Sequence, residues 1–235
     1  MDVFARLGAI EADRVLDVAC GPGGFVAHLV ANLRRCGHVT AVDVVEGYGP
    51  QLKERFPDRP LDYHVMEGES LEFADATFDA ASISYALHHV RDPAVVLAQM
   101  RRVLRPGGWL VVAEPHSGTD NDRQRSDHLV HAWRARTDTH LGVRHNPPLT
   151  REAVLALVSA LALRDLEVND YSPDDRDKDQ ARTLGQIAQY LERLEAARGK
   201  DAELLRSEGR SLAARVRTIG IEAAPAVLVL GRVGA

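Results

Sequence analysis

Apolar residues in the first part of the chain follow two alternating spacings, which predict strands and helices in turn. A short β-branched run over 14–19 is typical of a buried parallel strand. The glycine-rich segment 20–24 follows, and apolar residues spaced three and four apart across 25–33 then predict a helix. A second apolar run at 38–43 predicts another strand. Strand, glycine turn, helix and strand form a right-handed βαβ unit by default.

The same alternation continues to about Glu114. Asp92 suits the N-cap of a helix, because its carboxylate can accept hydrogen bonds from free backbone N–H groups. Pro93 suits the first helical position, because the backbone N–H that proline lacks has no partner within the helix there. A further short helix is expected at 50–56, and further strands at 61–66, 78–84 and 109–113. Elements alternating in this way predict an α/β fold with a doubly wound, Rossmann-like sheet.

The pattern changes in the second half of the chain. Segment 120–137 predicts a charged helix, Thr150 caps another helix to about 161, and 163–171 and 226–232 predict two late strands, which bring the total to seven. Between these strands, the charged insert 172–218 predicts a helical hairpin, packed on the sheet edge or on a second subunit. It would serve as a lid over the acceptor, with Tyr190 and Leu194 inward, or as an interface. Its two apolar faces carry Leu184, Ile187, Leu191 and Leu194, and Leu205, Leu212, Val216 and Ile219.

Composition narrows the class of protein. The 235 residues are 45% apolar and 27% charged, which is ordinary for a soluble globular chain, and the net charge of −5 lacks the basic field of a nucleic-acid binder. Two cysteines, Cys20 and Cys36, exclude a disulfide framework. The longest mostly apolar stretch, 153–163, is shorter than the roughly 20 residues that span a bilayer. We expect a cytoplasmic protein with no nucleic-acid or membrane partner.

The glycine turn and the acid at 43 point to a nucleoside-containing cofactor. Glycines let the backbone approach a ligand, the next helix offers free N–H groups, and Asp43 can accept both ribose hydroxyls. The dinucleotide fingerprint requires a third glycine or alanine where Val26 stands. Asp17 would repel a pyrophosphate and attract an ammonium group, which favours S-adenosylmethionine. A nicotinamide-dependent oxidoreductase is the less favoured alternative.

Five stretches in order resemble the class I S-adenosylmethionine-dependent methyltransferases, in particular the type 11 branch that contains the ubiquinone and menaquinone methyltransferases. The stretches are 15–23, 39–43, 67–73 together with 78–79, 86–90 and 103–108. The resemblance implies a seven-stranded, mostly parallel sheet with an antiparallel last strand and a helical insert before it. The sequence has no internal repeat and no low-complexity linker, so we expect one domain over 1–235, with a cofactor-binding half at 1–116 and an acceptor-side half at 117–235.

The resemblance further implies which residues surround the cofactor. The methionine end would be held by Asp17, Ala19, Gly21 and Gly23. The ribose and adenine would be held by Asp43, Val44, Glu67 and Gly68. The methionine tail and transferred methyl would be lined by Ser84 and Tyr85. Ala19 departs from the family pattern, which has glycine there, and so does Glu67, where aspartate is commoner.

Methyl transfer from a sulfonium is an in-line displacement that needs positioning more than a nucleophilic residue. If the acceptor is a hydroxyl or an ammonium, a general base helps, and the candidates are His88, His89 and His116. His128 and His131 share a helical face, but no cysteine or carboxylate completes a set, so no metal is expected. Cys20 reads as a small buried filler.

The predicted function is methyl transfer to a small-molecule acceptor, with S-adenosylhomocysteine as product. The alternative is a protein of this fold that uses S-adenosylmethionine without methyl transfer, as a cyclase, decarboxylase or regulatory binder. The short segment before the first strand leaves open a homodimer, in which a neighbouring subunit closes the site.

Overall fold

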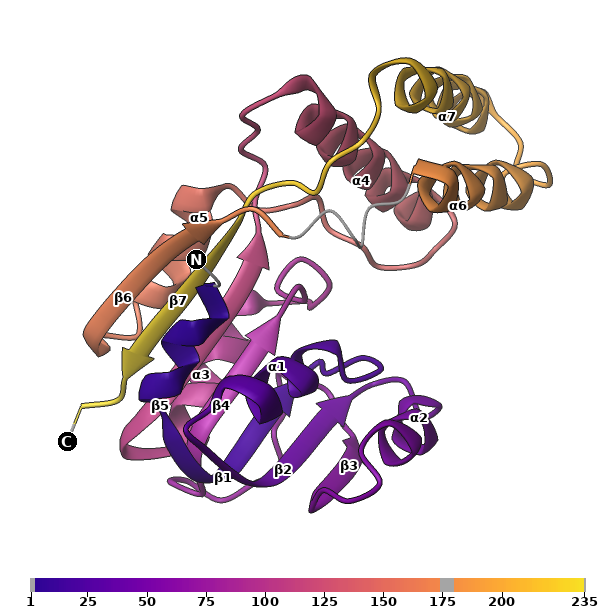
Figure 1. Cartoon of the computed structure of the whole chain (residues 1–235). Helices are drawn as coiled ribbons and strands as arrows, with labels where there is room; N and C mark the ends of the chain where they lie inside the picture. Colours follow the sequence, from indigo (N-terminus) through magenta and orange to yellow (C-terminus); the bar gives the residue numbers. More distant parts are fainter. Residues whose placement is uncertain (1–2, 174–179, 235) are drawn as a thin grey trace. The chain divides into compact units, whose positions relative to one another are not determined.

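Seven strands form one sheet in the computed structural model, which describes residues 3–173 and 180–234 (Figure 1). The pairs β1–β2, β1–β4, β2–β3 and β4–β5 are parallel, whereas β7 runs opposite to its neighbour β5. The doubly wound, mostly parallel sheet with an antiparallel last strand is therefore confirmed. In sheet order the strands are β3 (Leu61–Val65), β2 (Arg35–Asp43), β1 (Glu11–Val18), β4 (Phe78–Ser84), β5 (Leu104–Pro115), β7 (Ala226–Arg232) and β6 (Arg164–Tyr171).

The two central strands β1 and β4 are buried over most of their length. Val15, Leu16 and Val18 on β1 are each at most 1% exposed, and six of the seven residues of β4 are buried. Strands apolar on both faces are stable only where helices cover both sides of a parallel sheet. Because β1, β2 and β4 are parallel, their carboxyl ends lie along the same edge, which places Val18, Asp43 and Ser84 there.

Short-range signals correctly place the helices that follow the strands. The Asp92 side chain accepts hydrogen bonds from the N–H groups of Ala94 (3.0 Å) and Val95 (3.2 Å), and Thr150 Oγ1 accepts one from Ala153 N–H (3.1 Å). These contacts mark the starts of α3 (Pro93–Val103) and α5 (Arg151–Ser159). The first part of the chain also forms the 3₁₀ helix η1 (Val3–Ala9), α1 (Gly24–Asn32) and α2 (Tyr48–Arg55).

The described residues divide into two compact units. The first, here called the sheet unit, runs up to Glu114 and takes in Val154–Asn169 and the residues from Val227 onward. The second, here called the helical unit, comprises Pro115–Ala153 and the described part of Asp170–Ala226. The first unit ends near the expected boundary at 116, but two late segments return to it. The single domain over 1–235 stays a prediction.

The helical unit has its own core, built from α4 (Asp122–His140), α6 (Gln180–Arg193) and α7 (Lys200–Ile219). Trp133 of α4 is fully buried there, and its indole N–H donates to Leu205 O at 2.8 Å. α6 and α7 confirm the predicted hairpin within the insert, of which residues 174–179 lie outside the described part. From the sequence we expected this hairpin to pack on the sheet edge or on a second subunit, whereas it packs on α4. Ile219, expected to face inward, is 38% exposed.

No helix in the described ranges is both long and apolar enough to cross a membrane.

Candidate functional site

The loop after β1 has an unusual backbone. Ala19, Gly21 and Gly23 all have positive φ, at 52°, 52° and 82°. A Cβ on Gly21 would meet nothing within 4 Å, whereas one on Gly23 would lie 2.5 Å from a Leu52 side-chain carbon. Gly23 therefore suits both its left-handed backbone and the close approach of Leu52, and Gly21 leaves an open backbone surface. Ala19 holds a left-handed conformation that disfavours non-glycine residues by about 1–2 kcal/mol, and such strain is typical of binding sites.

Asp43, at the end of β2, faces this loop. Its Oδ2 accepts from Gly21 N–H at 2.9 Å, and its Oδ1 accepts from Val45 N–H at 3.1 Å. The carboxylate is half-buried, and the neighbouring Val44 is 62% exposed. The structure thus brings the predicted ribose acceptor beside the glycine loop and leaves an apolar side chain next to it.

Asp17 is a buried carboxylate with one unsatisfied oxygen. Its side chain is 1% exposed, and Ser82 Oγ donates to Oδ1 at 2.6 Å. Its Oδ2 is buried and accepts no hydrogen bond from the part of the chain that the structure describes. Burial raises the pKa of Asp17 to about 7, against the lowering effect of the Ser82 hydrogen bond, and the Asp43 charge raises it further. An orphaned buried carboxylate oxygen calls for a donor, and a cationic donor satisfies it best.

Glu67 and Gly68 lie in the loop after β3. A Cβ on Gly68 would lie 3.0 Å from Val18 Cγ1, so a side chain there would press on the end of β1. Glu67 is exposed, and its Oε2 pairs with an Arg91 guanidinium nitrogen at 2.8 Å. Arg91, to which the sequence analysis gives no role, therefore orients the predicted adenine acceptor.

The end of β4 carries a second strained residue. Tyr85 has φ 53°, and its backbone N–H donates to Ala113 O at 2.7 Å. Its side chain is 39% exposed, and Ser84 before it is half-buried. Both predicted methyl-lining residues therefore lie at the same sheet edge as Asp43 and the glycine loop.

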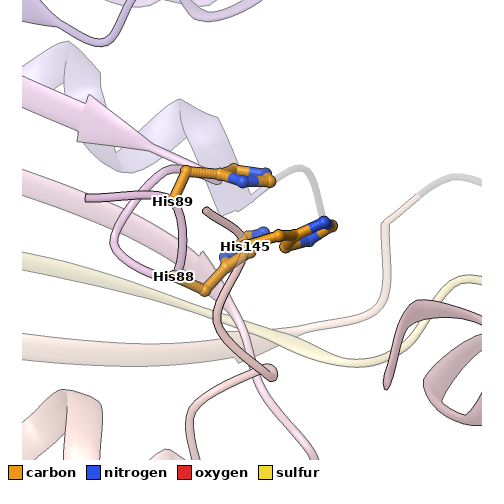
Figure 2. Close-up of side chains that lie close together, drawn as sticks. All are labelled: His88, His89 and His145. Carbon is orange, nitrogen blue, oxygen red and sulfur yellow. The ribbon is translucent and has the colours of Figure 1, made fainter. Parts of the chain in front are cut away.

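A buried pair joins His88, in the loop after β4, to Glu114, near the end of β5. Glu114 is fully buried; its Oε2 accepts from the N–H groups of Ala86 (3.1 Å) and Leu87 (3.2 Å), and its Oε1 lies 2.5 Å from His88 Nδ1. His89 stacks obliquely on His88 with ring centroids 4.1 Å apart (Figure 2). His145, also labelled in that figure, belongs to the helical unit. The sequence named both histidines but missed Glu114, which fixes one of them.

His116 belongs to the helical unit. It is 7% exposed, and its Nδ1 accepts from Gly118 N–H at 3.2 Å. Burial lowers its pKa, while Asp170 acts in the opposite direction. A neutral imidazole that accepts at Nδ1 carries its proton on Nε2, so this ring is arranged as a hydrogen-bond donor rather than a base.

Cys20 is buried in the glycine loop, and burial with the nearby charges of Asp17 and Asp43 raises its pKa. The expected burial of Cys20 is therefore confirmed, and a thiol held protonated is a poor nucleophile.

Known proteins resemble this chain in sequence and in fold. Residues 16–112 match the family described as "Methyltransferase domain". A demethylmenaquinone methyltransferase from Renibacterium salmoninarum is 42% identical over 113 residues, which are 48% of this chain and 45% of that protein. The chain thus spans less than half the length of this curated relative.

Two solved structures extend the likeness to the whole chain at the level of the fold. A SAM-dependent methyltransferase from Methanosarcina mazei has a TM-score of 0.63 at 14% identity, over 100% of this chain and 98% of that one. A phosphoethanolamine N-methyltransferase from Haemonchus contortus, solved with S-adenosyl-L-methionine, has a TM-score of 0.61 at 17% identity, over 99% of this chain and 51% of that one. Residues 16–112 are therefore similar in sequence to methyltransferase domains, and the whole chain shares the fold of these two solved methyltransferases.

Proposed function

We propose that this chain transfers a methyl group from S-adenosylmethionine to a small-molecule acceptor and releases S-adenosylhomocysteine. The observation that carries the proposal is the buried Asp17 carboxylate, whose Oδ2 lacks a hydrogen bond from the described residues. An amino acid end with an ammonium group would supply the missing cationic donor and favour the ionised carboxylate, whereas a pyrophosphate-bearing cofactor offers no such donor. This chemistry separates S-adenosylmethionine from NAD.

The other residues of the edge fit the same cofactor. Asp43 already presents both carboxylate oxygens beside the loop, and Val44 offers an exposed apolar face to a planar base. Glu67, oriented by Arg91, can accept from an exocyclic amine. The bound cofactor would supply a methyl group activated by its sulfonium. The residues 19–23, Gly68, Ser84 and Tyr85 would hold and enclose it.

The His88–Glu114 pair is the best candidate for accepting a proton from the acceptor. Glu114 lies within hydrogen-bonding distance of His88 Nδ1, which favours the tautomer with its proton on Nδ1 and leaves Nε2 as the basic nitrogen. Glu114 is itself held by two backbone N–H groups, so the imidazole is fixed in orientation. His89 is the exposed second candidate, and the Nδ1 hydrogen bond of His116 disfavours that residue as a base.

The name of the Renibacterium relative makes quinol-type rings the first acceptors to assay, alongside phenols and amines. The net charge of −5 and the reduced state of both cysteines support a cytoplasmic enzyme without a nucleic-acid or membrane partner. A homodimer stays part of the proposal, with its test in the mass of the purified chain in solution.

The experiment is a coupled assay of S-adenosylhomocysteine release over such an acceptor panel. We expect one product methyl per S-adenosylhomocysteine, and a decrease in kcat of about 10²–10⁴-fold in His88→Gln. His38→Gln, at the opposite end of β2, is the matched control and should keep wild-type turnover. Acceptor conversion without consumption of S-adenosylmethionine would contradict methyl transfer and favour the cyclase, decarboxylase or regulatory alternative.

A further inference from the structure

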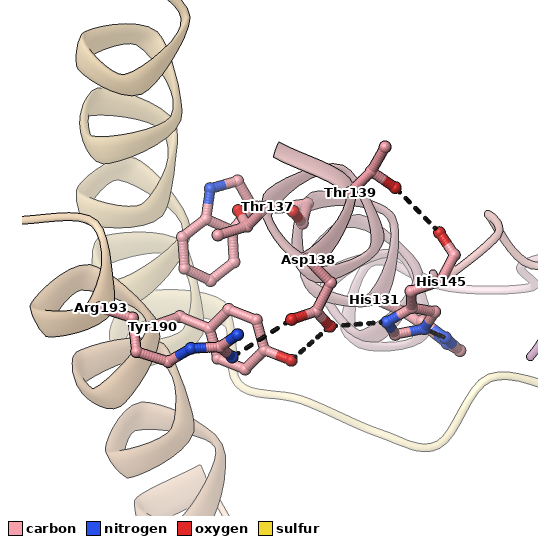
Figure 3. Close-up of polar contacts among 8 residues, drawn as sticks. His131, Thr137, Asp138, Thr139, His145, Tyr190 and Arg193 are labelled. Atoms are coloured by element: carbon pink, nitrogen blue, oxygen red, sulfur yellow. Dashed lines mark hydrogen bonds and ion pairs between the residues drawn. The ribbon is translucent and has the colours of Figure 1, made fainter. Parts of the chain in front are cut away.

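A buried carboxylate organises the polar centre of the helical unit. Asp138 of α4 accepts from Tyr190 Oη–H at 2.6 Å, from an Arg193 guanidinium N–H at 3.2 Å and from His145 Nδ1–H at 2.9 Å (Figure 3). All three contacts end on the Asp138 carboxylate, whose oxygens act as acceptors, so Asp138 is a fixed acceptor for His145 Nδ1–H.

Two histidine side chains face each other at this centre, each through its Nε2 atom. The Nε2 atoms of His145 and His131 lie 3.1 Å apart (Figure 3). His131 stands seven residues, or two helical turns, before Asp138 on the same face of α4. The chain after α4 folds back to deliver His145, helped by a 2.8 Å hydrogen bond from Val143 N–H to Asp138 O.

The spacing of the two nitrogens suits a shared metal ion. Imidazole nitrogens bind Zn²⁺ at about 2.0–2.1 Å, so two such ligands lie about 2.9 Å apart at a right angle and about 3.3 Å apart at the tetrahedral angle. The observed 3.1 Å falls between these values. Metal-bound histidines commonly donate their other ring N–H to a carboxylate, which is the relation of His145 to Asp138.

We propose that His131 and His145 bind a divalent first-row transition-metal ion, of which Zn²⁺ fits best, through their Nε2 atoms, with Asp138 as the outer-shell carboxylate. Imidazole ligands select Zn²⁺, Co²⁺, Ni²⁺ or Cu²⁺ over Mg²⁺ and Ca²⁺. Two imidazoles leave coordination positions for water or another oxygen or nitrogen donor, as in open zinc sites. His145 is buried and His131 is half-buried, so the ion would be reached from the His131 side.

This inference revises the sequence-based expectation of no metal. The sequence suggested His128 and His131 as a pair at helical spacing, whereas the structure pairs His131 with a residue fourteen positions later. The competing arrangement is a simple N–H···N hydrogen bond between the two rings, with a proton in place of the ion. The proposal goes beyond methyl transfer and does not depend on it.

The test uses the whole chain, stripped with a chelator and titrated with CoCl₂ by visible absorption and with ZnCl₂ by calorimetry, without S-adenosylmethionine. We expect one ion per chain, at least a tenfold loss of affinity in His131→Gln and His145→Gln, and about a 10–100-fold loss in Asp138→Asn. His140→Gln, on the exposed last turn of α4, is the matched control and should bind as wild type does.

A direct measurement on the wild-type chain keeps the test independent of variant folding. Zinc-edge anomalous diffraction from crystals grown with ZnCl₂ should place one ion within bonding distance of both Nε2 atoms. An absence of stoichiometric metal binding, or binding that survives both histidine substitutions, would overturn the proposal. The two rings would then be joined by an N–H···N hydrogen bond. Because no cofactor is added, these outcomes are separate from any failure of the methyl-transfer proposal.

Discussion

The raised pKa of Asp17 makes the folding stability of the sheet unit depend on pH in a defined direction. The folded chain keeps a proton on Asp17 up to about pH 7, whereas the unfolded chain releases it near the ordinary aspartate pKa of 3.8. Between these values the folded state binds more protons, so the free energy of unfolding falls as pH rises. The contribution is fully present below pH 4 and lost once pH passes through about 7.

The size of the effect follows from the shift. A difference of about three pKa units at about 1.4 kcal/mol each gives about 4 kcal/mol over the whole window. Between pH 5 and pH 8 the wild-type chain should lose about 3 kcal/mol of this. The asparagine of Asp17→Asn cannot ionise, so the variant should lose none of this free energy of unfolding. The difference in free energy of unfolding between variant and wild type should therefore shift by about 3 kcal/mol in favour of the variant from pH 5 to pH 8.

The assay is urea unfolding at pH 5, 6, 7 and 8, followed through Trp109 fluorescence. Both chains carry Trp133→Phe, because Trp133 lies in the helical unit and would add a second signal. Asp58→Asn, an exposed surface carboxylate, is the control and should track wild type. Parallel pH profiles for wild type and Asp17→Asn would refute the reasoning and show that Asp17 is solvated or paired.

Four further substitutions test the ribose acceptor, a strained backbone position and the packing of two helical glycines. Asp43→Ala should weaken S-adenosylmethionine binding by about 1–3 kcal/mol, because ribose hydroxyls lose their acceptor; unchanged affinity in calorimetry would remove the ribose assignment. Ala19→Gly should raise the free energy of unfolding by about 0.5–1 kcal/mol, since φ is 52° there, and a lower melting temperature would contradict this. Gly209→Ala should destabilise the helical unit by about 1–3 kcal/mol, because its Cβ would overlap the Trp133 ring. Gly185→Ala, whose Cβ meets nothing within 4 Å, should instead stabilise α6 by about 0.5–1 kcal/mol; equal melting curves for the two alanine variants would contradict the packing account.

Features coded by neighbouring residues could be predicted from the sequence. The Asp92–Pro93 start of α3 is set within one helical turn, so the sequence alone placed it. Asp17 could be identified from the sequence because a carboxylate within an apolar strand is buried and therefore requires a hydrogen-bond or cationic donor. The residues at the sheet edge followed from one rule, that parallel strands end together.

Features that depend on long-range pairing could not be predicted. Glu114 is one acid at the end of a strand, and its role arises only when β4 pairs with β5 and brings Ala86 and Leu87 N–H groups to it. Arg91 acquires its role through Glu67, twenty-four residues earlier. The packing of the hairpin on α4 likewise depends on the contact between Trp133 and Leu205, which are 72 residues apart.

Binding of S-adenosylmethionine by the sheet unit, through Asp17 and the loop after β1, can be measured by calorimetric titration of the full chain, in parallel, with S-adenosylmethionine, S-adenosylhomocysteine and NAD. We expect one binding site for each sulfur ligand and no heat from NAD. Binding of NAD alone, or silence from both sulfur ligands, would contradict this expectation.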